Sequence, residues 1–395
     1  MFERICIKDK KSENYRLDIG FLIDTILFYG KVIVIAHREE LNILFSSLGE
    51  NLIKELISSG RLEIKFKGNI LGSMIFPDGK YSVNTLSSQD VTLDSILYKI
   101  HRKKVNNSTR NLKFSSEFSQ IITPYNYGKV VRENIVSDFN NVELLSKTLP
   151  LYINSIVPNF ELPEKTEIEI IKDDSFGPYD AYSLNSNIDL KELNKIHKQN
   201  KPEVEYDIDY SGFLLSMAES KGDIHLASDL ASELVTSDLY SKFIEVELNE
   251  LIAKRAKSET ELNLFKEYSL ANCTSLGNAY VNGTLSEKEL LRIFEKSDKF
   301  REWLSKIPED GSLLGEYHKA VISKDLSDKL PTKTARFVIF EGIGITLDLL
   351  GAGGIGTAVA TSLALGDTFL LDRIINRKWK PNQFIDNTLK PKIKA

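Results

Sequence analysis

The sequence predicts an α+β protein, with a mixed α/β module at residues 1–156 followed by a mainly α-helical domain. In roughly the first 125 residues, short apolar runs rich in Ile and Val alternate with amphipathic stretches, which indicates a mixture of strands and helices. From residue 210 to about residue 306, apolar residues instead recur every three to five positions, as on one face of a helix. A chain of 395 residues with 42% hydrophobic and 27% charged residues is ordinary for a globular protein of roughly two to three domains.

The N-terminal module is expected to begin with strands at residues 2–8 and 31–36, on either side of a buried helix at residues 18–29 that Gly30 ends. Beyond them, the pattern predicts helices at residues 39–47 and 50–59 and strands at residues 61–67, 70–76 and 81–86. Pro77-Asp78-Gly79 is a strong turn signal, so the last two strands should form a hairpin.

The order helix, turn, helix, strand, hairpin is also that of a winged helix-turn-helix, so a winged-helix-like module is one interpretation. Its second helix would read DNA, and it would need basic or amide side chains for phosphates and base edges. That helix offers only Asn51 and Lys54, beside Glu50 and Glu55. These electrostatics are poor for DNA, so nucleic acid is not the partner that we expect.

The middle of the chain divides into three stretches. A helix at residues 88–101 leads into a basic, polar loop that starts at His101-Arg102-Lys103-Lys104 and that is either solvated or in contact with a phosphate backbone. Residues 157–209 contain four prolines and are expected to be a connector with a short strand at residues 166–171. An α-helical domain should follow at residues 210–330, and its apolar stripe includes Leu226, Leu230, Leu234, Leu239 and Phe243.

Residues 331–395 are expected to form a Gly/Ala-rich apolar helical hairpin followed by a basic tail. Residues 349–366 contain 18 consecutive uncharged residues, of which five are glycine. The tail at residues 373–395 has seven basic residues and one acid, a net of +6, in a chain whose formal charge is -5. Glycine and alanine allow two backbones to approach closely, so the first interpretation is a hairpin that packs on itself or on a partner.

A second interpretation rests on the six residues 351–356, which match the pattern G-x-G-x-x-G. A strand could precede Gly351, a helix could follow Gly356, and Asp372 lies 21 residues after the first glycine, where a carboxylate binds a ribose hydroxyl. The stretch therefore resembles the dinucleotide-binding fingerprint of Rossmann enzymes over 28 residues. That resemblance implies cofactor contacts at Gly351, Gly353, Gly356 and Asp372.

A third interpretation is a membrane-associating effector that uses residues 337–380. A hairpin with small-residue faces could insert conditionally, because 18 uncharged residues are the lower edge of a spanning helix. Basic residues would then lie against anionic headgroups with a tryptophan at the interface. The candidates for membrane or partner contact are Leu363, Leu365, Arg373, Arg377, Lys378, Trp379 and Lys380.

Catalytic and metal-binding signals are weak. The five histidines are far apart in the sequence, and no P-loop, G-x-S-x-G or H-E-x-x-H pattern occurs. The two cysteines, Cys6 and Cys273, give no C-x-x-C spacing, so we expect neither disulfides nor a zinc site, and a reducing compartment is the natural location. We therefore expect no cofactor and no metal, and we do not expect an active site.

The distribution of charge points to partners rather than to chemistry. Between residues 201 and 259 there are 13 acidic and six basic residues, a net of -7, whereas the C-terminal tail nets +6. Residues 1–11 lack the apolar core of a secretory signal. The function that we expect is therefore a cytoplasmic interaction or regulatory protein, which self-associates or binds a protein partner and conditionally an anionic membrane surface.

Overall fold

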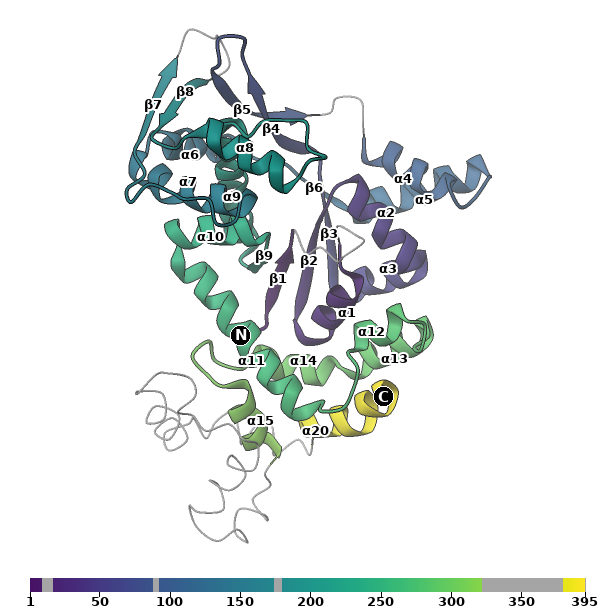
Figure 1. The fold of residues 1–395 in the computed structure, drawn as a ribbon. Coiled ribbons are helices and arrows are strands. Elements are labelled where there is room, and N and C mark those ends of the chain that lie inside the picture. Colours follow the sequence, from purple (N-terminus) through teal and green to yellow (C-terminus); the bar gives the residue numbers. More distant parts are fainter. Residues whose placement is uncertain (9–16, 88–91, 174–179, 322–378, 395) are drawn as a thin grey trace, which may run out of the picture. The chain divides into compact units, whose positions relative to one another are not determined.

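A computed structural model describes residues 1–8, 17–87, 92–173, 180–321 and 379–394 (Figure 1). The chain divides into two compact units. The larger unit comprises residues 2–260 and 275–288, and the smaller unit comprises residue 1, residues 261–274 and the chain from residue 289 onward. The α+β class is confirmed, because the larger unit combines helices with a parallel sheet and an antiparallel sheet.

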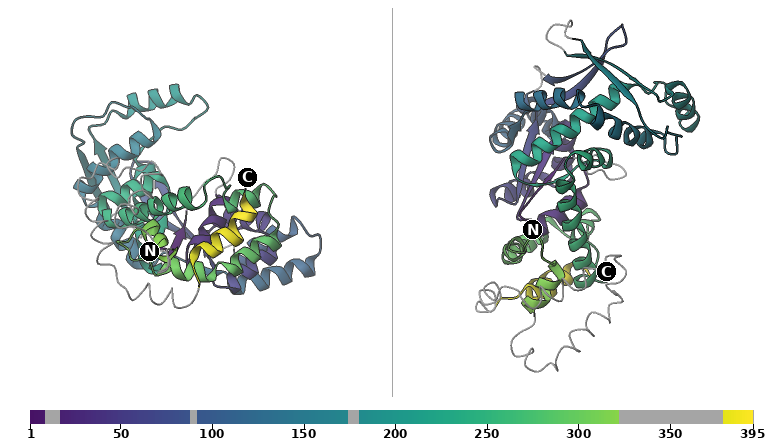
Figure 2. Two further views of the ribbon diagram at one scale, coloured as in Figure 1. Left: turned by 90° about the horizontal axis from the view of Figure 1, so that it is seen from below. Right: turned by 90° about the vertical axis from the view of Figure 1, so that its left-hand side faces the viewer.

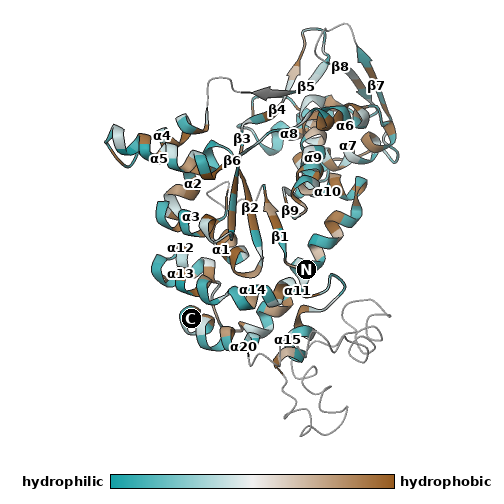
Figure 3. Ribbon diagram, turned by 180° about the vertical axis from the view of Figure 1, so that it is seen from behind, coloured by the Kyte–Doolittle hydropathy of each residue, from teal (hydrophilic) through white to brown (hydrophobic). Residues whose placement is uncertain are grey.

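A five-stranded parallel sheet organises the larger unit. Its strands lie in the order β6 (Thr123–Tyr125), β3 (Leu62–Lys67), β2 (Lys31–Ala36), β1 (Arg4–Ile7) and β9 (Glu233–Val235). Strands β1 and β2 are apolar along most of their length, as strands covered on both faces must be (Figure 3). Strand β3 instead alternates apolar residues with Glu63, Lys65 and Lys67. Cys6 pairs with Ile33 of β2 and with Leu234 of β9, which fixes the register at the middle of the sheet.

Helices cover both faces of this sheet. On one face, Cys6 and Ile33 pack against α9 (Tyr210–Leu230) and α10 (Asp238–Glu247). The other face is contacted by α1, α2 and α3 (Ile19–Phe28, Arg38–Ser47 and Gly49–Ser58). The chain crosses the sheet in one direction from β1 to β6 and returns in the other direction to β9, so right-handed crossovers place their helices on opposite faces.

The larger unit also contains a four-stranded antiparallel sheet (Figure 2). Its order is β4-β5-β8-β7, with bounds Asn69–Ile75, Tyr81–Ser87, Ala181–Ser186 and Ile168–Asp173. The hairpin between β4 and β5 confirms the sequence prediction. It turns at Gly79, whose φ of 80° is a backbone conformation that glycine adopts without strain.

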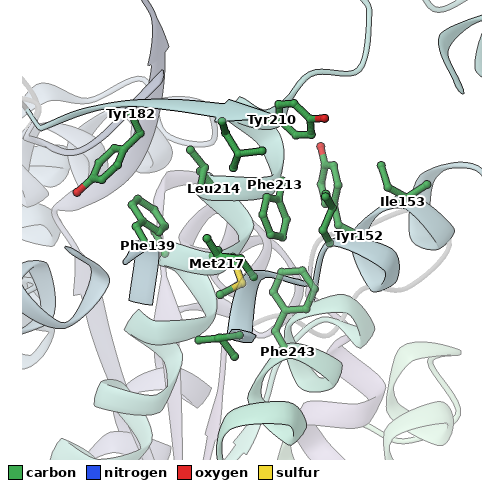
Figure 4. Packing of buried hydrophobic residues seen from close by; sticks show 14 of the residues in the cluster. Phe139, Tyr152, Ile153, Tyr182, Tyr210, Phe213, Leu214, Met217 and Phe243 are labelled. Carbon is green, nitrogen blue, oxygen red and sulfur yellow. The ribbon is translucent and has the colours of Figure 1, made fainter. Parts of the chain in front are cut away.

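Helix α9 connects the cores of the two sheets. Its C-terminal half packs on the parallel sheet, whereas Phe213, Leu214 and Met217 in its N-terminal half lie in the core beneath the antiparallel sheet (Figure 4). Phe243 of α10 and Phe139 of α6 (Lys129–Phe139) belong to the same core, together with side chains of α7 (Val142–Ile156) and α8 (Leu190–Asn200). Because α9 is buried on several sides, polar residues along it must find partners inside the protein.

A helical hairpin of α4 (Leu93–Arg102) and α5 (Ser108–Ile121) packs against α2 and α3. The rings of Phe114 and Phe118 meet Phe45 of α2 edge-on, with centroid distances of 5.0 and 4.7 Å. His101 stacks on Phe114 at 4.4 Å, and its two ring nitrogens lie 2.6 Å from Asn111 Oδ1 and 3.0 Å from Glu50 Oε1. These contacts fix the hairpin to the sheet domain.

The smaller unit is helical in its described residues. Its core contains Phe265 of α11, Phe300 of α14, Tyr317 of α15 and Phe384 of α20, and Phe300 stacks on Phe384 at 5.1 Å. Helix α11 (Asn249–Ser269) belongs to both units, and α12 (Leu276–Val281) belongs to the larger one. The other helices are α13 (Glu287–Lys296), α14 (Asp298–Ser305), α15 (Leu313–Val321), α20 (Pro381–Phe384), the π-helix η3 (Ile385–Leu389) and α21 (Lys390–Ile393).

None of the helices in the described ranges combines the length and the apolar character that crossing a lipid bilayer requires. The predicted helical hairpin and the predicted membrane-contacting segment fall mainly on residues 322–378, which lie outside the described residues.

Three further sequence interpretations differ from the observed structure. The winged-helix-like module is not confirmed, because β3 pairs in parallel with β2 and β6 and the β4–β5 hairpin belongs to another sheet. The prediction that Leu234 continues a helical stripe is wrong, because Leu234 is the middle residue of β9. Residues 157–209, predicted to be a connector with one strand, contain β7, β8 and α8.

Candidate functional site at the carboxyl edge of the parallel sheet

Every strand of the parallel sheet brings a polar side chain to its carboxyl end. Lys8 and His37 directly follow β1 and β2, Lys67 is the last residue of β3, and Thr236 directly follows β9. Tyr127 lies two residues after β6. Side chains alternate along a strand, so these residues fall on the face that carries Cys6, Ile33, Ile35 and Leu234, which is the face covered by α9. We call the five residues, with Glu219 and Asp223 of α9, the edge cluster.

The edge cluster lies where the strand order reverses. The chain proceeds from β1 to β2, β3 and β6 on one side of β1, whereas β9 lies on the other side of β1. In open α/β sheets, ligands bind outside the carboxyl ends of the strands at this switch point. Lys8 and Thr236 stand at the ends of the two strands that flank it.

Lys8 is held by the two carboxylates of α9. Its Nζ forms ion pairs with Asp223 Oδ1 and, at 2.7 Å, with Glu219 Oε2. The Thr236 hydroxyl donates to the second oxygen of Asp223 at 2.5 Å. Asp223 is fully buried, so these bonds supply the partners that a buried carboxylate needs.

Lys67 has a different set of partners. Its Nζ donates to the Tyr127 hydroxyl at 2.6 Å and lies 3.4 Å from Glu219 Oε2, the oxygen that also binds Lys8. The same Nζ is 4.2 Å from the centroid of the Tyr127 ring, within the range of a cation–π contact. Glu219 therefore joins the two lysines, and Tyr127 covers one of them.

The two lysines differ in their affinity for a proton. Burial would lower the pKa of Lys8, but the charges of Asp223 and Glu219 outweigh burial and raise this pKa well above its ordinary value. Burial and the nearby Lys8 ammonium lower the pKa of Lys67 to about 8, against the opposing effect of Glu219. Lys8 therefore stays an ammonium, whereas Lys67 exchanges its proton near neutral pH.

The other titrating groups of the edge cluster respond to the lysines. Burial would raise the pKa of Glu219, but Lys8 and Lys67 lower it to about 2. Burial and the charge of Lys67 lower the pKa of His37, so its imidazole is neutral at pH 7. Burial raises the pKa of Tyr127 well above its ordinary value, so the phenol keeps its proton. Near neutral pH, Lys67 is thus the member whose charge changes.

Tyr127 reaches Lys67 because α9 carries a glycine at the point of contact. A Cβ atom at position 222 would lie 2.5 Å from the Tyr127 hydroxyl oxygen and 2.6 Å from Cζ, which are distances that real contacts do not show. The Tyr127 backbone N–H donates to Asn69 Oδ1 at 3.1 Å and fixes the main chain after β6. Gly222 and Asn69 are therefore positioning residues for Tyr127.

The edge cluster is buried at Lys67 and Asp223 and partly open elsewhere. The side chain of Lys67 is 2% exposed, whereas those of Lys8 and Glu219 are 12% and 14% exposed. His37, Tyr127 and Thr236 are half-buried. The partly exposed members of the edge cluster are therefore Lys8, Glu219, His37, Tyr127 and Thr236, and the amine of Lys67 is covered. Such an amine can act as a general acid, a general base or a nucleophile.

The site residues predicted from the sequence lie elsewhere. Gly351, Gly353, Gly356 and Asp372 fall outside the described residues, as do Leu363, Leu365, Arg373, Arg377 and Lys378. Trp379 is half-buried, and Lys380 donates from Nζ to the Val321 carbonyl at 3.0 Å. Further along the tail, Phe384, Ile385, Leu389 and Ile393 are buried in the smaller unit.

Sequence reasoning missed the edge cluster, although part of the signal was visible. The predicted strands at residues 2–8 and 61–67 both end in a lysine, and the predicted strand at residues 31–36 is followed by His37. Charged residues at the ends of apolar runs mark the carboxyl edge of a parallel sheet. Their partners on α9 had no comparable signal, because Glu219 and Asp223 are more than 200 positions from Lys8.

Comparison of the chain with protein-family models, with curated proteins and with solved structures returned no match in any of the three.

Proposed function

We propose that the carboxyl edge of the parallel sheet is an active site in which Lys67 transfers a proton to or from a small polar substrate. One observation carries the proposal: a lysine with a pKa of about 8 ends β3 at the carboxyl edge of the sheet, in contact with a tyrosine hydroxyl and with the carboxylate that also binds Lys8. Lysines with lowered pKa values are a recurrent feature of catalytic sites.

Each member of the edge cluster has a distinct role in this proposal. Lys67 is the catalytic residue, acting as an acid in its ammonium form and as a base in its amine form. Lys8 is a positioning residue whose fixed charge keeps the pKa of Lys67 low. Glu219 holds the two ammonium groups together, and Asp223 anchors Lys8 from within the protein.

A purely structural role is the competing explanation, in which the ion pairs only attach α9 to the sheet. In the proposal a small molecule reaches Lys67, whereas in the structural explanation no small molecule does. We suggest NMR of the full chain with ¹³C-labelled lysine side chains, in which Lys67→Arg identifies the Lys67 signal. Inorganic phosphate and pyruvate serve as simple anionic and carbonyl-bearing probes.

The proposal expects at least one probe to move the Lys67 signal and leave that of the exposed Lys165 in place. Signals that respond equally, or a Lys67 signal that does not respond to either probe, would favour the structural explanation. Each probe is added at constant pH, so that a change of titration state does not mimic binding.

The hypotheses from the C-terminal sequence concern other residues and stay predictions. They are self-association or partner binding through the small-residue segment, conditional binding to anionic membranes, and dinucleotide binding at residues 351–356. Light scattering of the full chain tests the first, sedimentation with anionic vesicles the second, and thermal shift with NAD, NADP and FAD the third. Deleting residues 373–395 is a poor test, because it removes Phe384 and Leu389 from the core of the smaller unit.

A further inference from the structure

A strongly basic segment lies at the end of the α4–α5 hairpin and contains no residue of the edge cluster. Residues 99–113 (KIHRKKVNNSTRNLK) contain six lysines and arginines and no acidic residue, in a chain whose formal charge is -5. All six side chains belong to exposed residues: Lys99, Arg102, Lys103, Lys104, Arg110 and Lys113. We call these six residues the basic tip.

The geometry of the hairpin concentrates these charges. Lys99 and Arg102 are in the last turn of α4, Lys103 and Lys104 are in the connection, and Arg110 and Lys113 are in the first two turns of α5. At about 1.5 Å of rise per helical residue, their backbones lie within roughly 10 Å of the hairpin end along each helix. The whole end of the hairpin is therefore positively charged.

Few of these charges are neutralised by the protein itself. Among the described residues, the carboxylate nearest to a basic-tip ammonium is that of Glu117, 3.8 Å from Lys113, and Glu117 lies closer to Lys54, at 2.5 Å. Lys104 donates to the Phe45 carbonyl at 2.9 Å, and Lys103 lies 3.4 Å from Asn42 Oδ1. Both partners are neutral oxygen atoms, so the net charge of the tip remains.

We propose that the basic tip binds the phosphate backbone of double-stranded nucleic acid, without preference for sequence. Lysine and arginine neutralise phosphates and release counterions, which supplies most of the affinity of non-specific binding. The hairpin is fixed to α2 and α3 by Phe114, Phe118 and His101, so the charges are presented on a rigid support. The polar Asn106, Ser108 and Thr109 at the same end are exposed and can donate to phosphate oxygens.

The chemistry of the tip favours a duplex over other polyanions. Single strands are bound by stacking bases on aromatic rings, and residues 99–113 contain no Phe, Tyr or Trp. Anionic membranes are bound most firmly when apolar side chains accompany the basic ones, whereas Phe114 and Phe118 of the hairpin are buried and Tyr98 is half-buried. Leu112, 61% exposed, is the large apolar side chain that the tip offers. The sequence-based expectation against nucleic acid rested on residues 50–59, whereas the basic loop that starts at His101 was open to contact with a phosphate backbone.

Fluorescence anisotropy of the full chain with a labelled DNA duplex and the matching RNA duplex tests the proposal. Non-specific phosphate binding has a steep salt dependence, with log K falling against log salt by about 0.9 per phosphate neutralised. With six cations, we expect affinity to fall by up to about a thousandfold between about 50 and about 200 mM salt. The triple variant Arg102→Gln, Lys103→Gln, Arg110→Gln should reduce the slope by roughly 2.7.

A matched control removes three exposed lysines from other surfaces of the same unit: Lys129→Gln, Lys165→Gln and Lys191→Gln. The control loses the same net charge as the triple variant, but it loses this charge outside the basic tip. The control should therefore keep the salt dependence of the parent chain. No duplex binding at low salt, or equal loss in both triple variants, would overturn the proposal. So would binding of anionic vesicles through the tip without binding of a duplex. None of these results bears on Lys67.

Discussion

Two glutamates of the larger unit, the half-buried Glu219 and the buried Glu233, show how the charge of a partner decides the role of a carboxylate. Glu233, the first residue of β9, is 4% exposed and accepts hydrogen bonds from the hydroxyls of Tyr29 and Ser258, at 2.9 and 2.8 Å. Burial raises the pKa of Glu233, against the effect of these hydroxyls. Glu219, whose side chain is 14% exposed, faces two lysines, and its pKa falls to about 2.

This difference in partners distinguishes Glu233, which has a structural role, from Glu219, which belongs to a cluster of charged groups. Neutral hydroxyls connect Glu233 to α1 and α11, and no titration near neutral pH is needed for that connection. At the carboxyl edge, two cations share one carboxylate oxygen, so one of them holds its proton weakly. A group whose pKa lies near the working pH suits proton transfer, and in the charged cluster Lys67 is such a group.

The largest expected effect comes from removing a cation from the charged cluster. Lys8→Met leaves the buried Asp223 without its ammonium partner, and breaking such a pair costs about 3–5 kcal/mol of unfolding free energy. Glu233→Gln should cost about 1 kcal/mol or less, because an amide can still bond both hydroxyls. Urea unfolding of the two variants measures the contrast. Similar losses in both would show that the two clusters are energetically alike.

The pH dependence of stability should have opposite signs at the two glutamates. The folded-state pKa of Glu219 is below its unfolded value near 4.5, so its contribution is present above about pH 4.5 and is lost toward pH 2. The folded-state pKa of Glu233 is raised, so its protonated form is favoured and its contribution declines as the pH rises above about 4.5.

Unfolding free energies of the parent, Glu219→Gln and Glu233→Gln chains between about pH 3 and pH 7 test this sign. Each unit of pKa difference corresponds to about 1.4 kcal/mol. The unfolding free energy of the parent minus that of Glu219→Gln should decrease as the pH falls. The unfolding free energy of the parent minus that of Glu233→Gln should increase as the pH falls. Parallel curves would contradict the comparison.

A smaller effect is expected where α9 admits Tyr127. Gly222→Ala places a Cβ atom against the tyrosine ring, and such overpacking costs about 1–3 kcal/mol, offset by about 1 kcal/mol of helix propensity. Gly315→Ala in α15 is the control, because its Cβ would meet Ser312 at an ordinary 3.4 Å and should be neutral or stabilising. If Gly222→Ala were as harmless, Tyr127 would not be held by close packing.

Local patterns in the sequence predicted much of the parallel sheet. The run KVIVIA gave the bounds of β2, and the expected helix at residues 18–29 is capped by Asp18, whose side chain accepts from the Phe21 N–H at 2.9 Å. Strands β6 and β9 were missed because each has only three residues. β6 also contains Pro124, which an edge strand tolerates, and β9 begins with the buried Glu233.

The edge cluster could be predicted only in part. Lys8 and Lys67 stand at the ends of predicted strands, but nothing local distinguishes Glu219 and Asp223 from solvent-facing acids of a long helix. Their burial follows from α9 packing on two sheets at once, which is a property of the tertiary structure. The lowered pKa of Lys67 depends in turn on those contacts.

The most direct test of the central claim is the pKa of Lys67, measured from the ¹³Cε chemical shift of labelled lysine in the full chain. We expect a midpoint near pH 8 for Lys67. Glu219→Gln should lower the Lys67 midpoint further, because the carboxylate favours the ammonium form. A midpoint for Lys67 close to 10.5 in the parent chain would contradict the account.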